Sequence, residues 1–333
     1  MSFSLLVLPA LSRLRPLFLF LFVIVGVTGC SSVERQPRVE TPRVIRDQPR
    51  EEVVQLQIFL DGERFGPGVV DGRPGEFTAK ALDLYRQARD LPADWEPDLS
   101  NLAAFTTYTV GQGDFAALGT MASEPVEIAM QKRLPYTRLS ELIGERFHTT
   151  EAYLRQLNPG VNFASLSAGD VVKVPNVKRP FYADRFPSQY RRQPPSRGVQ
   201  RSVLINANTR ILMVRDDGRL IAALPITPGS VEHPAPAGEW KVVRAVPWPW
   251  YRYDEGVLKR GERTTDFHQF PPGTNSPVGI LWAGLNRPGI GIHGTSTPET
   301  IGRSGSHGCI RLSNWDAATF YTLVQTGMKV TIR

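Results

Sequence analysis

The chain has 333 residues, of which 41% are apolar and 21% charged, and its net charge is +7 at pH 7. This length corresponds to two or more average domains, and the composition is that of an ordinary globular protein, which excludes a chain that is disordered throughout. The modest positive charge suits a polyanionic surface without identifying one.

The first thirty residues are predicted to form an export signal. Arg13 and Arg15 precede the apolar run Leu17–Val27, which has the length of a signal core and is shorter than the roughly 18 residues needed to span a membrane. The next residues, TGC, complete a segment VTGC that resembles the lipobox of bacterial lipoproteins. The resemblance implies a signal peptide over residues 1–29 and a lipid on Cys30. A plain signal peptide or an uncleaved anchor is the alternative.

Ser31 bears on the location of such an anchor. In lipoproteins of diderm bacteria, serine rather than aspartate after the lipidated cysteine favours sorting to the outer membrane. The resemblance therefore implies a periplasmic protein that is anchored by lipid in the outer rather than the inner membrane. Residues 30–50 are rich in Arg and Pro and lack an apolar period, which predicts a disordered linker.

Two small modules are predicted before the C-terminal half. Residues 51–95 contain two helical apolar patterns separated by GPGVVDGRPG, and they resemble a peptidoglycan-binding helical domain, with a structural spacer as the alternative. Residues 104–177 resemble a LysM domain, a βααβ glycan binder, with YTVGQGD at the first strand and LSAGDVVKVP at the last. An insertion between Phe115 and Arg138 departs from that pattern, so a scaffolding role stands beside glycan binding.

Local signals refine the second module and the segment after it. Thr149 or Thr150 is predicted to cap a helix over residues 151–157, which Asn-Pro-Gly ends. His148, beside this junction, is interpreted as a structural or surface residue. Residues 178–200 are a Pro- and Arg-rich linker, and their aromatic residues are too numerous for a bare spacer, so we expect packing along a domain surface.

Residues 201–333 have the pattern of strands. VLINANTRILMVRDDGRLIAALPIT predicts a three-stranded meander, and GEWKVVRAV and GIGIHGT add further strands. Ser313 and Asp316 form a capping-box pattern before one helix, which Gly327 is predicted to end before KVTIR returns to a strand. The predicted fold class is multidomain: a mainly β domain with a C-terminal helix, preceded by a small helical module and a βααβ module.

Aromatic residues and histidines inside this domain leave alternatives open. Trp248, Trp250 and Tyr251 in VPWPWYRYDE either line a substrate cleft or cover the end of a sheet. His233 lies in a predicted loop and is interpreted as structural. His268 has no partner that the sequence identifies.

The segment HGTSTPETIGRSGSHGCIRLS, residues 293–313, contains the second of the two cysteines. If Cys30 carries lipid, Cys309 has no disulfide partner in the chain, and such a cysteine in an exported protein is more often reactive than structural. A thiol needs a base or a positive environment to become a nucleophilic thiolate. His293 and His307 are both near in sequence, and His293, at a strand end, can approach across the loop. Backbone N–H groups at Gly308 and Cys309 can then face a developing oxyanion.

At these residues the resemblance becomes specific. His293-Gly294-Thr295, Gly302 and Ser306-His307-Gly308-Cys309-Ile310-Arg311 resemble the signature of the L,D-transpeptidase catalytic domain, the YkuD family. The resemblance extends over about residues 202–333 and includes GTNSPVGILW before the motif. It implies a β-sandwich catalytic domain over residues 201–333.

The resemblance also implies roles for these residues. Cys309 would be the nucleophile, and His293 the proton donor and acceptor, oriented by the backbone carbonyl of Gly294. His307 and Gly308 would form the oxyanion site. Ser306 and Arg311 would support the loop or bind the substrate.

The implied reaction acts on peptidoglycan stem peptides. Cys309 would form a thioester, and an amine would then resolve it, which forms a cross-link or attaches a wall protein. The alternatives are an L,D-carboxypeptidase or endopeptidase that uses the same site, or a noncatalytic peptidoglycan-binding lipoprotein. A metallopeptidase is disfavoured because no His-x-x-Glu-His run or paired-cysteine spacing occurs. The expected partners are stem peptides, glycan and, through Cys30, a membrane, with no cofactor, metal or nucleic acid.

Overall fold

The computed structural model describes residues 49–230, 232–303 and 308–333, which fall within one compact unit. The predicted signal peptide, Cys30, nearly all of the first linker, Ser306 and His307 lie outside the described residues. Within the described ranges, none of the helices is both long and apolar enough to cross a membrane.

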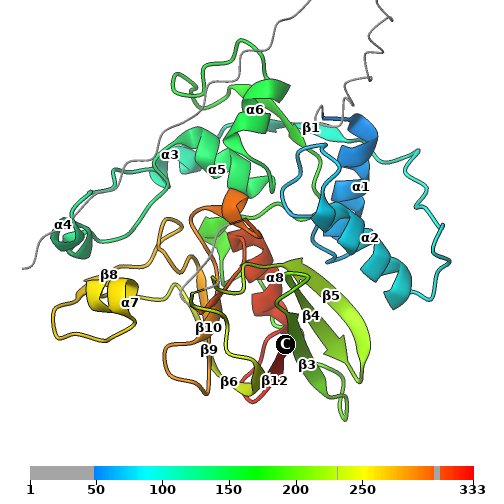
Figure 1. Ribbon diagram of the computed structural model, residues 1–333. Helices are drawn as coiled ribbons and strands as arrows, with labels where there is room; N and C mark the ends of the chain where they lie inside the picture. Colours follow the sequence, from blue (N-terminus) through cyan, green and yellow to red (C-terminus); the bar gives the residue numbers. More distant parts are fainter. Residues whose placement is uncertain (1–48, 231, 304–307) are drawn as a thin grey trace, which may run out of the picture. The chain divides into compact units, whose positions relative to one another are not determined.

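The first module is a pair of helices, α1 (Glu51–Gly62) and α2 (Glu76–Ala88), on either side of the predicted turn-rich segment. Leu60 and Phe65 are fully buried and share a cluster with apolar side chains of the large sheet. The backbone of Phe65 also forms a bridge with Ala223. The helical pair therefore packs directly against the sheet of the C-terminal domain (Figure 1).

The second module is built on two antiparallel strands, β1 (Phe105–Thr109) and β2 (Val171–Pro175), with α5 (Leu139–Arg146) and α6 (Glu151–Leu157) between them in the chain. Thr150 caps α6, because its side chain accepts a hydrogen bond from the Tyr153 N–H at 3.1 Å. This confirms the predicted helix and cap. Helix α3 (Gln112–Ala116) ends at the start of the inserted segment, and α4 (Pro125–Met130) lies within it.

The segment between the second module and the C-terminal domain is packed, as its aromatic residues predict. It contains one short 3₁₀ turn, η1 (Ala183–Arg185). Phe181 and Phe186 are buried in the main hydrophobic core, and the Phe186 ring meets that of Tyr321 edge to face, with ring centroids 4.9 Å apart. This segment is therefore part of the packed structure.

The C-terminal domain is organised around an eight-stranded sheet with the order β11-β10-β9-β6-β12-β3-β4-β5. Two neighbouring pairs, β12 with β3 and β10 with β11, are parallel, and the other pairs are antiparallel. The strands are β3 (Arg201–Asn206), β4 (Ile211–Asp216), β5 (Arg219–Pro225), β6 (Gly238–Pro247), β9 (Leu281–Leu285), β10 (Gly291–His293), β11 (Ile310–Arg311) and β12 (Lys329–Ile332). The prediction of a mainly β domain is confirmed.

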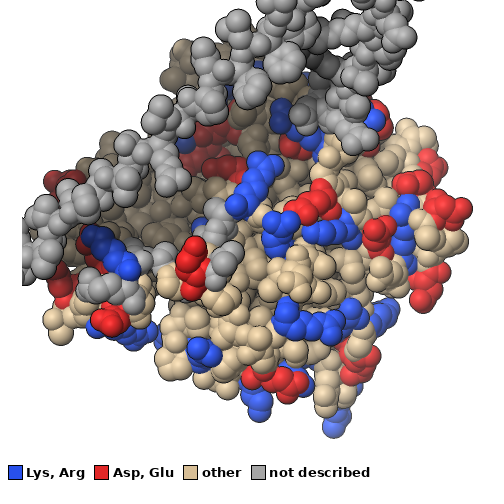
Figure 2. Space-filling view, viewed as in Figure 1, with Lys and Arg blue, Asp and Glu red and all other residues tan. Residues whose placement is uncertain are grey.

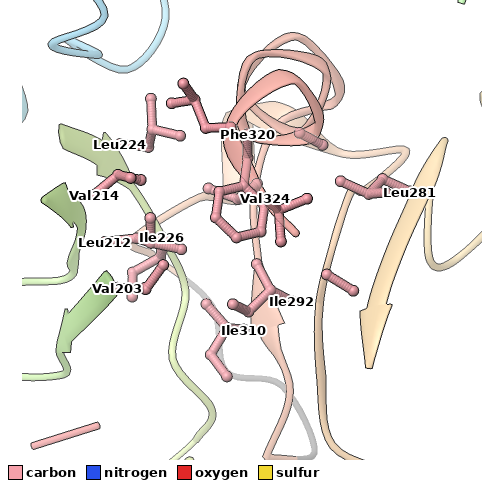
Figure 3. Close-up of a cluster of buried hydrophobic side chains, with 14 of the residues drawn as sticks. Val203, Leu212, Val214, Leu224, Ile226, Leu281, Ile292, Ile310, Phe320 and Val324 are labelled. Atoms are coloured by element: carbon pink, nitrogen blue, oxygen red, sulfur yellow. The ribbon is translucent and has the colours of Figure 1, made fainter. Parts of the chain in front are cut away.

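Helix α8 (Asn314–Leu323) packs on this sheet. Figure 3 shows Phe320 and Val324 between apolar side chains of β3 to β5 on one side and Leu281 of β9 on the other, with Ile292 of β10 and Ile310 of β11 below them. The two halves of the curled sheet therefore share one core through α8. Burial of such large aliphatic and aromatic side chains contributes about 1.5 to 3 kcal/mol each.

The sequence predicted the start of α8 correctly but not its end. Ser313 caps its start and accepts a hydrogen bond from the Asp316 N–H at 3.1 Å, as predicted. Its predicted end at Gly327 is wrong, because the helix stops at Leu323 and Val324 is extended. This places the Val324 side chain in the core. Gly327, with φ +84°, instead forms the turn into β12.

A small hairpin stands beside the main sheet. It consists of β7 (Tyr251–Tyr253) and β8 (His268–Phe270), with α7 (Glu255–Arg260) between them, and a short 3₁₀ turn, η2 (Pro298–Thr300), occurs later in the chain. On the face drawn in Figure 2, basic and acidic side chains are interspersed. The positive net charge is therefore not gathered there into an uninterrupted basic stripe.

Candidate active site

The pairing of β10 with β11 brings the two ends of the predicted catalytic segment together. In this parallel pair, Ile292 lies opposite Ile310 and His293 lies opposite Arg311. Ile292 and Ile310 are fully buried in the main core. Because side chains alternate along a strand, His293 and Arg311 point to the other face of the sheet. Cys309 immediately precedes β11, and its thiol is close enough to Arg311 for the two groups to interact electrostatically.

His293 is held in one orientation. Its Nδ1 lies 2.6 Å from the carbonyl oxygen of Gly294, and its ring stacks on that of Trp282 with centroids 5.6 Å apart. Nδ1 donates to the carbonyl, so Nε2 is the nitrogen left to accept a proton in the site. The side chain is also buried, which limits the ring to this packed position.

Burial and charge make the resting site neutral. Removal from solvent, together with the nearby Arg311 charge, lowers the pKa of His293 to about 4, although the bond to Gly294 opposes this. Burial raises the pKa of the Cys309 thiol, against the lowering effects of a Gly291 backbone hydrogen bond and of Arg311. The expectation that the surroundings lower the thiol pKa is therefore not met in the resting state, because burial outweighs both favourable contributions.

Cys309 lies on a tightly turned segment next to the β9–β10 connection. Its Sγ donates to the Gly289 carbonyl oxygen at 3.4 Å. Gly308, the residue before it, has φ +88°, a conformation that costs a residue with a side chain about 1 to 2 kcal/mol. The glycine therefore fixes how the chain approaches Cys309.

The residues of the aromatic stretch VPWPWYRYDE have different positions in the structure, so the two interpretations apply to different residues. Trp248 packs against the main core and donates from its indole N–H to the Phe186 carbonyl at 2.8 Å. Trp250 is 61% exposed. Tyr251 is near the thiol, since burial and then the charge of Cys309 raise its pKa. Trp248 therefore covers the sheet, whereas Tyr251 lines the candidate active site.

The other histidines have separate surroundings. His148 is buried, lies 2.9 Å from Asp61 Oδ1 and stacks on Trp315, which agrees with the structural interpretation. His268 stacks on Tyr253 in the β7–β8 hairpin. His233 is in a loop, where its backbone carbonyl accepts from Ser230. Over the described ranges, no group of three or more His, Cys, Asp or Glu side chains is placed to hold a metal ion.

Asn314 is the residue of the site that sequence reasoning missed. It is completely buried, and its Oδ1 accepts a hydrogen bond from the Ile280 N–H at 3.2 Å. Its amide oxygen fills the space beside Gly279 and Gly294, where a Cβ at either position would collide with it. In the sequence, the only sign of this packing is the presence of glycine at 279 and 294. Neither glycine is close enough to Asn314 in the chain to predict the contact.

Comparisons with known proteins identify a family for the C-terminal domain. Residues 200–332 match the family model described as the L,D-transpeptidase catalytic domain, YkuD. The YkuD protein of Bacillus licheniformis is 30% identical over 192 residues, which cover 58% of this chain and 92% of that protein. The YkuD protein of Bacillus subtilis is 25% identical over 190 residues, which cover 57% and 90% of the two chains. Among solved structures, L,D-transpeptidase 3 from Mycobacterium tuberculosis with a faropenem-derived adduct aligns with a TM-score of 0.34 at 18% identity, over 51% of this chain and 76% of that chain.

The mainly β domain brings the segments that contain His293 and Cys309 together, because His293 is in β10 and Cys309 immediately precedes the paired strand β11. The sequence matches make the assignment particular: the chain belongs to the YkuD family of L,D-transpeptidases. The 192 residues aligned with the B. licheniformis protein are more than residues 200–332 contain. The similarity to that relative therefore extends beyond the catalytic domain.

Proposed function

We propose that the protein is a cysteine-dependent L,D-transpeptidase that acts on peptidoglycan stem peptides through a thioester on Cys309. The observation that carries the proposal is the parallel pairing of β10 with β11, in which His293 lies opposite Arg311, two residues after Cys309. The Nδ1 bond to Gly294 supports the same assignment, because it leaves Nε2 as the proton acceptor.

The first half-reaction follows from two neutral groups. Sγ of Cys309 attacks the carbonyl carbon of the third stem residue, and His293 Nε2 takes the thiol proton as the new C–S bond forms. The tetrahedral oxyanion accepts hydrogen bonds from the N–H groups at Gly308 and Cys309. When the C–N bond breaks, the terminal D-Ala leaves with the proton from His293, and the shortened stem remains as a thioester.

The second half-reaction reverses the proton's path. An amine of a second stem attacks the thioester carbonyl and gives a proton to His293 Nε2. The C–S bond then breaks, and the sulfur recovers that proton as a thiol. Arg311 lies beside both groups, and its charge favours a thiolate over a thiol during each exchange. Ser306 and His307 are proposed to complete the loop and the oxyanion site.

We also propose that residues 1–50 deliver and tether the enzyme. In this proposal, the signal peptide is removed, Cys30 is lipidated, and the linker holds residues 51–333 in the periplasm at the outer membrane. The modules at 51–95 and 104–177 would place the catalytic domain on glycan strands. The extent of the similarity to the B. licheniformis protein supports a shared module before the catalytic domain.

Substitution of the nucleophile tests the reaction. Cys309→Ala is expected to abolish both D-Ala release and dimer formation from disaccharide tetrapeptide, measured by liquid chromatography and mass spectrometry of the products. The fall should reach the detection limit, because Cys309 is the only thiol among the residues that the structure describes. Unchanged D-Ala release by the folded variant would refute the mechanism. Release of D-Ala without dimers by the unsubstituted protein would assign hydrolysis to the site in place of transfer.

A further inference from the structure

A buried carboxyl group of the second module reaches the C-terminal domain. Glu145, in α5, is only 6% exposed, and its Oε1 accepts a hydrogen bond from Asn314 Nδ2 at 2.8 Å. Its other oxygen, Oε2, is hydrogen-bonded to the Tyr136 hydroxyl. Helices α5 and α8 are in contact here (Figure 1). The side chain at the start of α8 is therefore fixed from the small module.

Asn314 connects Glu145 to His293 through Gly294. Its Nδ2 also donates to the Thr274 carbonyl at 3.2 Å, and its Oδ1 accepts from Ile280 and lies against Gly294. The Gly294 carbonyl is the group that binds His293 Nδ1 at 2.6 Å. Three adjacent contacts thus connect Glu145 to the imidazole.

The same module holds the neighbouring loop of the C-terminal domain. Leu134 donates its N–H to the Pro272 carbonyl at 3.0 Å and accepts from the Asn275 N–H at 3.2 Å. Asn275 Nδ2 also donates to the Pro135 carbonyl at 2.8 Å. Gly273 is required at this contact, because a Cβ would collide with the Leu134 backbone. The second module therefore fixes this loop in two places. Leu134 and Pro135 bond its start at Pro272 and Asn275, and Glu145 holds its end at Ile280 through Asn314.

We propose that Glu145 is a positioning residue of the active site: by holding Asn314, it fixes the Gly294 carbonyl and, through it, the tautomer and orientation of His293. This inference rests on the proposed function of the site. It makes the second module a structural part of the catalytic apparatus in addition to any role in glycan binding. Glu145 itself touches neither the substrate nor the reacting atoms.

The chemistry of the carboxyl group agrees with this role. Burial raises the pKa of Glu145 to about 8, so the group is mostly protonated and uncharged at neutral pH. A neutral acceptor for Asn314 is what the site needs, since a buried charge without a cation would be costly. An amide can supply the same acceptor, which gives a conservative substitution for the test.

Two substitutions at this position separate positioning from bulk packing. Glu145→Leu keeps much of the volume and removes both oxygens, and we expect kcat to fall about tenfold or more while KM changes less than about twofold, because the imidazole loses its fixed position. Glu145→Gln keeps an acceptor for Asn314 and is expected to restore most of that kcat. Asn158→Ala is the matched control. It removes a buried polar group that bonds only within the module, to Leu154 and Lys173, so it should lower Tm and leave kcat unchanged.

The histidine itself provides a readout that a loss of stability alone would not move. In ¹⁵N-histidine-labelled protein, with His293 assigned from the spectrum of His293→Gln, the wild-type ring should be a single neutral Nδ1–H tautomer. Glu145→Leu should give mixed tautomers, and Tyr136→Phe, which removes only the hydroxyl that holds Glu145, should shift them in the same direction. Tyr136→Phe also serves if Glu145→Leu does not fold.

The outcomes are distinct for this inference and for the proposed function. Wild-type kcat and an unchanged His293 tautomer in both variants would overturn the positioning role. An inactive wild-type protein would overturn the proposed function, and the tautomer shift would still decide whether Glu145 positions His293.

Discussion

The proposed catalytic pair, Cys309 and His293, rests as a neutral thiol and a neutral imidazole. Burial lowers the pKa of His293 to about 4 and raises that of Cys309, so each group has moved away from its charged form. A neutral imidazole can accept the thiol proton as the sulfur attacks. The thiol is also protected from reaction when no substrate is bound, because thiolate is the reactive form.

The lowered histidine pKa predicts an unusual acid limit for the reaction. A histidine with an ordinary pKa near 6.5 would lose its basic form below that pH, whereas His293 keeps it down to about pH 4. We therefore expect kcat/KM to be level from pH 7 to pH 5 and to fall near pH 4, while circular dichroism shows that the fold is retained. An acid limb between pH 6 and 7 in the folded protein would contradict the neutral, buried environment of His293.

At the scale of the structural elements, the turn before β11 decides where the sulfur lies. Gly308 has φ +88°, and a Cβ there would make ordinary contacts with Ile290 Cδ1, at 3.4 Å, and with the Pro234 carbonyl oxygen, at 3.6 Å. The cost of a side chain at this position is therefore conformational rather than steric. The pairing of β11 with β10 fixes the strand, and the conformation of Gly308 fixes the direction in which the chain enters it.

Gly308→Ala should accordingly lower both stability and activity. We expect a loss of about 1 kcal/mol in urea unfolding and a fall in kcat of tenfold or more, because the altered turn displaces Cys309. Gly160→Ala is the matched control, since Gly160 has φ +83°, has no neighbouring atom within 4 Å of an added Cβ and ends α6 far along the chain from the site. It should cost similar stability and leave kcat unchanged. Equal kcat values for the two variants would argue against a role for the turn.

Local patterns predicted the elements well where one short segment determines the structure. The Asn-Thr and Asp-Gly turns identified β3, β4 and β5, and the Ser313 cap marked the start of α8. The end of α8 was not predictable, because burial of Val324 in the core decides it. Likewise, no local signal places β12 between β3 and β6. That position depends on contacts between segments far apart in the sequence.

The same limit applies to the site. The motif itself pointed to His293 and Cys309, since their residue types and setting suit a thiol reaction. The sequence did not show whether Tyr251 and Trp248 line a substrate cleft or cover the end of a sheet. Only the fold shows that Tyr251 is near the thiol and that Trp248 covers the sheet. The bond between Glu145 and Asn314 joins residues 169 positions apart, so it is visible only in three dimensions.

At the scale of the whole molecule, the modules and the catalytic domain share buried polar contacts. One such contact is the bond between Glu145 and Asn314. A second joins Asp61 of the first module to His148 of the second, and both interact electrostatically with Asp316 of α8. Burial raises the pKa of Asp316 to about 7. Two carboxyl groups whose pKa values are raised by burial thus lie in the region where the modules meet α8, which couples their packing to pH.

This coupling predicts how stability depends on pH. The folded pKa of Glu145, about 8, exceeds the ordinary value of 4.5, so its contribution is fully present below about pH 4.5 and is lost as pH rises to about 8. Glu145→Gln has no proton to lose. The free energy of unfolding of the wild type, relative to that of Glu145→Gln, should therefore decrease between pH 5 and pH 8 in urea titrations. A difference that is independent of pH would contradict the buried, neutral state of Glu145.

The covalent state of Cys309 tests the central claim most directly. Protein beginning at residue 31, which retains every described residue, is mixed with disaccharide tetrapeptide, quenched in acid and analysed by intact-mass and peptide mass spectrometry. The proposed mechanism predicts an adduct of the substrate minus D-Ala on Cys309, which disappears as cross-linked dimer forms when acceptor stem is added. Turnover of the tetrapeptide with no adduct on Cys309, or with an adduct on another residue, would contradict it.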